Sequence, residues 1–227
     1  MFRKLLFPQR CVSCGKFDAQ YLCFNCFQKI PFSEVQYYPV CEKPAYHGIT
    51  HFDCQKKYSL DGHLSLTTYD GVVKDVVEFY KRRNVRKLEL PIEKIMQLYL
   101  LGDAELFDWT IGAEKMLVPV PLFWLDTRLR NYNPAENIAH IASMYLECPV
   151  QTDVLEKIYP TRQQKKLSKQ ERRKNLTNSF GVSKNISADV IIVDDIWTTG
   201  ATLRECAKVL KKAGALKVFG LTFARGH

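Results

Sequence analysis

The stretch that most constrains this chain of 227 residues is the string ADVIIVDDIWTTGATL at residues 188–203. Its apolar run Val190–Val193 is β-branched throughout, which favours a short buried strand over a helix. The pattern predicts that Asp194 and Asp195 close this strand. Two carboxylates would then stand at the C-terminal edge of a sheet, where open α/β sheets bind ligands.

A glycine turn at Thr198–Gly200 is predicted to lead into a helix that has one apolar side. This helix is expected to end at Gly214. Backbone N–H groups at such a helix start favour an anion. The hydroxyls of Thr198, Thr199 and Thr202 add donors, and the two acids suit sugar hydroxyls or a metal. We therefore expect a sugar-phosphate cradle, whereas the purely structural alternative is a strand end followed by a helix cap. Neither a P-loop nor a G-x-G-x-x-G motif is present.

This string resembles the phosphoribosyl-diphosphate signature of type I phosphoribosyltransferases, with four apolar residues, two acids and then T-T-G-x-T. The resemblance implies that Asp194 and Asp195 hold the ribose 2′- and 3′-hydroxyls. It also implies that the 5′-phosphate is held by the turn and helix start, which are Thr198, Thr199, Gly200, Ala201 and Thr202.

Two C-x-x-C pairs near the N-terminus, Cys11–Cys14 and Cys23–Cys26, have the spacing of a tetrahedral zinc site. Four thiolates leave no open coordination position, so such a zinc would be structural. Redox-active or incidental cysteine pairs are the alternative. A second set with irregular spacing could form another metal site or be unrelated loop residues: Cys41, His47, His51 and Cys54. We expect a zinc-binding module with four cysteine ligands and a linker at residues 1–58, and a phosphoribosyltransferase-like domain at 59–227.

Elsewhere the sequence alternates between the periods of strands and helices. Strands are expected at residues 64–69, 115–120 and 216–223, and helices at 72–80, 90–101 and 134–146. This alternation predicts an α/β fold, a parallel sheet flanked by helices, with a small zinc-ribbon-like module at the N-terminal end.

The formal net charge of +9 points toward polyanionic partners. The most basic segment, residues 161–184, is expected to be an exposed arm beside the cradle that contacts nucleic acid through Lys165, Lys166, Lys169, Arg172 and Arg173. A second run of cations at residues 81–87 is either a solvated helix face or a phosphate contact. The aromatic residues Tyr132, Tyr159 and Trp197 would stack on bases or simply pack.

Nothing in the sequence resembles a membrane span or a signal peptide, because no run of about 18 uncharged apolar residues exists and residues 1–10 are short and basic. We therefore expect a cytoplasmic protein, where eight cysteines are metal ligands or free thiols rather than disulfides.

Taken together, several motifs resemble the ComF family of competence proteins and look most like its ComFC branch. They are the C-x-x-C pairs, V-P-V-P at residues 118–121, Arg130 and Asn133, the phosphoribosyl signature, and the spaced residues Gln164, Leu167, Ser168, Arg172 and Asn175. Where the family often has two further C-x-x-C pairs, this chain has only Cys41 and Cys54.

The resemblance implies a protein for uptake of transforming DNA. It would bind single-stranded DNA in the cytoplasm with a ComFA-like helicase partner, in peripheral association with the uptake machinery and on a phosphoribosyltransferase-like scaffold. The alternative is an active phosphoribosyltransferase in which Mg²⁺ bridges the diphosphate of the donor and the acceptor is unknown.

Overall fold

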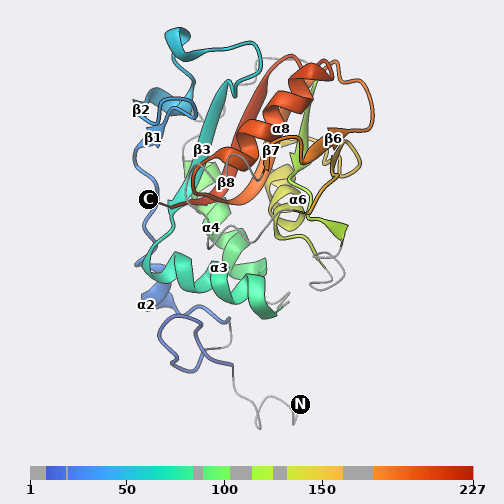
Figure 1. The fold of residues 1–227 in the computed structure, drawn as a ribbon. Coiled ribbons are helices and arrows are strands. Elements are labelled where there is room, and N and C mark those ends of the chain that lie inside the picture. Colours follow the sequence, from blue (N-terminus) through green and yellow to red (C-terminus); the bar gives the residue numbers. More distant parts are fainter. Residues whose placement is uncertain are drawn as a thin grey trace.

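The centre of the protein is a four-stranded parallel sheet, seen in a computed structural model that describes residues 9–18, 20–83, 89–102, 114–124, 132–160 and 176–226. The strands lie in the order β3-β8-β7-β4, and every neighbouring pair is parallel (Figure 1). Their bounds are Gly62–Thr68 for β3, Lys115–Pro119 for β4, Asp189–Trp197 for β7 and Val218–Arg225 for β8. The expected parallel α/β sheet is confirmed.

Helices cover both faces of this sheet. On one face α3 (Gly71–Arg83), α4 (Glu89–Gly102) and α6 (Pro134–Leu146) share a buried cluster with Ile191 and Val193 of β7. On the other face α8 (Ala201–Lys212) packs against the alternate residues Val190 and Ile192. Because β7 is buried on both sides, its sequence is a continuous apolar run instead of an alternating one.

The strand β7 is longer than its apolar run, so the expectation that Asp194 and Asp195 close it is wrong. Pairing with β8 continues past the acids, with Ile196 opposite Ala224 and Trp197 opposite Arg225. Backbone groups make this ladder, and β8 reaches Arg225, so polar side chains on β7 do not end it. The glycine turn therefore begins after Trp197.

A small antiparallel ribbon lies beside α8 and was not expected from the sequence. It pairs β5 (Leu155–Lys157) with β6 (Phe180–Val182). Both strands have three residues, which is too short to show a clear period in the sequence. Because β6 and the buried residues Leu176 and Phe180 fall within residues 161–184, the expectation of an exposed arm is wrong for the described end of that segment.

The N-terminal segment contains the short helix α2 (Phe24–Phe27), the strands β1 (Gln36–Tyr37) and β2 (Pro44–Ala45), and the 3-10 turns η1 (Tyr46–Gly48) and η2 (Phe52–Cys54). Figure 1 shows α2 close to α3. Four apolar side chains of this segment join the core under α3 and α4: Cys11, Leu22, Cys26 and Ile30. The N-terminal segment is thus packed onto the sheet domain, and a domain boundary near residue 58 stays a prediction.

Candidate functional sites

The first candidate site lies where β7 turns into α8. Asp194 and Asp195 are partly buried, and a carboxylate oxygen of Asp194 accepts a hydrogen bond of 2.8 Å from the backbone N–H of Asp195. This contact orients the carboxylate of Asp194 at the carboxyl end of a central strand.

A lysine that sequence reasoning did not pair with the acids contacts them in the structure. Lys81, from the last turns of α3, places its Nζ 2.8 Å from Oδ2 of Asp195. Burial alone would lower the pKa of Lys81, but Asp195 and Asp194 outweigh it and raise this pKa. The only signal in the sequence was the run of cations at residues 81–87, which does not say which cation faces the cradle.

Asp194 itself is hard to ionise. Burial, and then the negative charge of Asp195, raise the pKa of Asp194 to about 7, although Lys81 opposes the shift. Near neutral pH this side chain is present both as an acid that can donate a hydrogen bond and as a carboxylate that accepts one. Such a pair suits a ligand with neighbouring hydroxyls.

The turn between Trp197 and α8 requires glycine. Gly200 has φ of +66° and forms the N-cap of α8, and a Cβ added there would lie 2.1 Å from Cζ2 of Trp197. The turn thus keeps its backbone tight against the indole, and a twelve-residue helix with its first N–H groups follows directly.

The three threonines of the turn do different things. Thr198 is exposed and Thr202 is partly exposed, so their hydroxyls are accessible to a ligand. Thr199 is buried, and its Oγ1 accepts a hydrogen bond of 3.4 Å from the backbone N–H of Ala201. Thr199 therefore shapes the turn through this contact.

The three aromatic residues considered for stacking on bases also differ in their exposure. Trp197 is 1% exposed and lies on the ring of His63, with centroids 4.0 Å apart, so of the two alternatives for this residue the structure supports packing. Tyr132 packs edge-on against Tyr80, whereas Tyr159 is exposed. The predicted nucleic-acid residues Lys165, Lys166, Lys169, Arg172 and Arg173, and the motif residues Arg130, Gln164, Leu167, Ser168 and Asn175, lie outside the described residues.

Asn133 of the expected R-x-x-N turn has a structural contact. Its side-chain oxygen accepts a hydrogen bond from the backbone N–H of Ala135 and caps α6, while its amide group donates to the carbonyl of Val120. The residue therefore joins α6 to the segment that follows β4.

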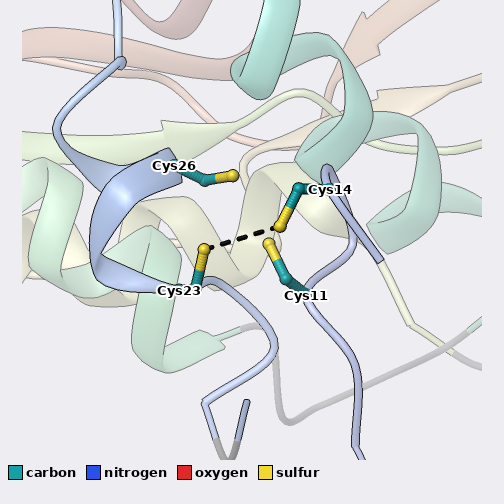
Figure 2. Close-up of side chains that lie close together, drawn as sticks. All are labelled: Cys11, Cys14, Cys23 and Cys26. Carbon is teal, nitrogen blue, oxygen red and sulfur yellow. Dashed lines mark hydrogen bonds between the residues drawn. The ribbon is translucent and has the colours of Figure 1, made fainter. Parts of the chain in front are cut away.

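The second candidate site is the four-cysteine cluster in Figure 2. The sulfur atoms of Cys11, Cys14, Cys23 and Cys26 all lie within 4.8 Å of one another, and those of Cys14 and Cys23 are 3.6 Å apart. Zinc–sulfur bonds of about 2.3 Å in a tetrahedron put sulfur atoms about 3.8 Å apart. The arrangement fits a structural zinc ion.

The same four thiols make an unfavourable cluster without a cation. Burial raises the pKa of Cys11, but backbone hydrogen bonds from Cys14, Cys23 and Ser13 lower it to about 6. Burial and its sulfur neighbours raise the pKa of Cys26 to about 12. One thiolate thus opposes ionisation of another, and a bound divalent cation removes this conflict.

The third candidate site is a second cluster, of Cys41, His51 and Cys54, whose ligand atoms lie within 4.8 Å of one another. The sulfur of Cys41 is 3.7 Å from Nδ1 of His51, close to the roughly 3.6 Å expected for two ligands of one tetrahedral zinc ion. His47, which the sequence suggested as a fourth ligand, is not part of this cluster.

The sequence matches one protein family and several individual proteins. The family described as "Double zinc ribbon domain" matches residues 2–55. Competence protein F of Haemophilus influenzae is 38% identical over 114 residues, which are 48% of this chain and half of that protein. DNA utilization protein YhgH of Escherichia coli O157:H7 is 31% identical over 187 residues, 79% of this chain and 80% of the relative.

A further relative covers nearly the whole chain. Competence protein ComFC of Bacillus subtilis is 25% identical over 228 aligned residues, 90% of this chain and 84% of that protein. Within the described residues no helix combines the length and apolar character that crossing a membrane needs.

Proposed function

Because this chain belongs to the ComF family of competence and DNA utilization proteins, we propose that it acts in the uptake of transforming DNA. In this proposal it binds single-stranded DNA in the cytoplasm together with a ComFA-like helicase, in peripheral association with the uptake machinery. The names of the relatives support the DNA role, and the net charge of +9 is favourable for a polyanion.

The residues that we propose for ligand binding form the cradle before and at the start of α8, which consists of the two acids Asp194 and Asp195 and the turn and helix start at residues 198–202. Asp194 and Asp195 stand beside the glycine turn, with Lys81 2.8 Å from Asp195. The proposal uses the acids for sugar hydroxyls, the helix N–H groups for an anion and Lys81 for charge balance. We propose that this cradle binds a phosphorylated pentose, either the ribose of a free phosphoribosyl diphosphate or the deoxyribose at the end of a DNA strand.

The DNA part of the proposal is tested by fluorescence anisotropy with a short single-stranded oligonucleotide at several salt concentrations. Each phosphate contact contributes about 0.7 to the slope of log affinity against log salt. Neutralising Lys165, Lys166, Arg172 and Arg173 should lower the slope by up to about 3. A matched control neutralises four exposed lysines elsewhere: Lys29, Lys56, Lys57 and Lys74. Equal slopes in the two variants would reject the arm as the DNA contact.

The ribose part is tested by calorimetric titration with phosphoribosyl diphosphate. Replacing both acids, Asp194→Asn and Asp195→Asn, should abolish binding because amides keep the shape and lose the charge. Unchanged affinity in the double variant would reject the cradle as the binding site.

The alternative function, transfer of the phosphoribosyl group to an acceptor, uses the same residues. The pKa of about 7 at Asp194 favours it, because a group that titrates near neutral pH can exchange a proton with a substrate. Mg²⁺ would accompany the diphosphate in this case. Release of diphosphate in the presence of candidate acceptors distinguishes turnover from binding alone.

A further inference from the structure

Arg204, in the first turn of α8, joins the turn that precedes this helix to the loop at residues 39–42. Its Nη1 donates a hydrogen bond of 2.7 Å to the carbonyl of Thr199. Its Nε donates to the carbonyl of Pro39 at 2.7 Å, and its Nη2 lies 3.0 Å from Oε1 of Glu42. A planar guanidinium with several fixed donors can make all three contacts at once, which an ammonium group cannot do with the same geometry.

One end of this connection is the turn of the cradle. The carbonyl of Thr199 directly precedes Gly200, the residue with φ of +66° that starts α8. The guanidinium also lies over the ring of Trp197, 5.3 Å from its centroid. The backbone of the turn is thus held from the side of α8 by one charged group.

The other end is the loop that carries Cys41. Pro39 and Glu42 flank this cysteine in the sequence, and Glu42 has φ of +59°, a conformation that few non-glycine residues adopt without support. A metal ion held by Cys41, His51 and Cys54 would fix the loop that supplies two of the three acceptors of Arg204.

We propose that Arg204 is a positioning residue that couples metal binding at Cys41, His51 and Cys54 to the conformation of the cradle turn. Metal binding orders the loop at 39–42, this loop holds Arg204, and Arg204 holds the carbonyl of Thr199. Coupling between two sites is reciprocal, so a ligand in the cradle also strengthens metal binding at this cluster. The reciprocal part rests on the proposed function of the cradle.

The coupling can be tested without any cradle ligand by hydrogen–deuterium exchange of the full chain. The N–H of Arg204 donates to the carbonyl of Gly200, so exchange in a peptide covering residues 198–206 reports on the turn. In the zinc-loaded protein, Cys54→Ser should speed this exchange by at least about fivefold, the lower end of usual coupling between sites.

Cys54→Ser should have less effect on the exchange of residues 198–206 in a variant that already lacks the contacts of Arg204 with the loop at 39–42. In the background of Arg204→Lys, Cys54→Ser should change the exchange by less than about twofold, because the coupled effect is lost in such a cycle. Lys208→Ala, which removes a partly exposed lysine paired with Glu205 on the same helix, is the matched control and should preserve the full effect. Equal effects of Cys54→Ser in all backgrounds would overturn the proposal.

A calorimetric titration with phosphoribosyl diphosphate separates this proposal from the proposed function. If the wild type binds, Cys54→Ser and Glu42→Gln should each weaken binding by at least about fivefold. If the wild type does not bind, the ligand assignment fails while the exchange experiment still decides the coupling.

Removing the zinc from the wild type with a chelator is a second measurement that does not depend on the folding of a variant. It should speed the exchange of residues 198–206, and an unchanged rate would overturn the proposal.

Discussion

At the scale of single residues, the cradle depends on groups whose environment changes their chemistry. Asp194 is the clearest case, because burial and Asp195 raise its pKa from 3.8 to about 7. Gly200 is the other, because its φ and its contact with Trp197 exclude any side chain. For each of these two residues, a single substitution is predicted to change the unfolding free energy in a way that can be measured.

The raised pKa of Asp194 predicts a pH dependence of stability. The folded state binds a proton more tightly than the unfolded chain, so this contribution is complete below about pH 4 and is lost as pH rises through 7. Between pH 6 and 8 the wild type should lose about 1.4 kcal/mol more of its unfolding free energy than Asp194→Asn does. Urea denaturation of both proteins at the two pH values measures this difference. Parallel losses would contradict the assignment.

The tight turn predicts that Gly200→Ala is more harmful than a similar change elsewhere. A left-handed backbone costs a residue with a side chain about 1–2 kcal/mol, and the contact with Trp197 adds about 1–3 kcal/mol. Gly71 also has a positive φ but has open space around it, so Gly71→Ala should show only the first cost. Equal losses of stability in urea denaturation would show that the indole does not constrain the turn.

At the scale of elements, the sequence predicted most strands and helices because their periods are clear. The helix after Gly200 lies at Ala201–Lys212 and is followed by Gly214 with φ of +103°, as expected for a glycine stop. The short strands β5 and β6 were missed, and β7 was judged too short, because backbone pairing with a neighbour is not visible in one strand's own residues.

The two metal clusters predict that zinc content follows the cysteines. Each cluster is expected to bind one zinc ion, so Cys14→Ser and Cys54→Ser should each lose one equivalent and the double variant both. Cys206→Ala removes a buried thiol of α8 that packs in the core outside the clusters, and should lose none. Metal analysis by mass spectrometry of the purified proteins checks this. An unchanged zinc content in Cys54→Ser would exclude the cluster of Cys41, His51 and Cys54 as a metal site.

At the scale of the whole molecule, contacts between distant parts of the chain were beyond prediction. The sequence located the cradle through one continuous string, but Lys81 reaches it only because α3 packs against the sheet, and Arg204 contacts Pro39 only because the N-terminal loop folds against α8. The choice between stacking and packing for Trp197 was open in the sequence for the same reason, since its burial against His63 depends on the pairing of β3 with β8. A continuous sequence motif can therefore indicate the kind of binding site, whereas tertiary packing determines which residues from other elements contact that site.

The most direct test of the central claim is displacement of labelled single-stranded DNA by phosphoribosyl diphosphate, followed by fluorescence anisotropy. We predict that the wild type releases the oligonucleotide as the competitor rises and that a variant with both Asp194→Asn and Asp195→Asn does not respond. Displacement that is equal in the wild type and the variant, or no binding of DNA at low salt, would contradict the account.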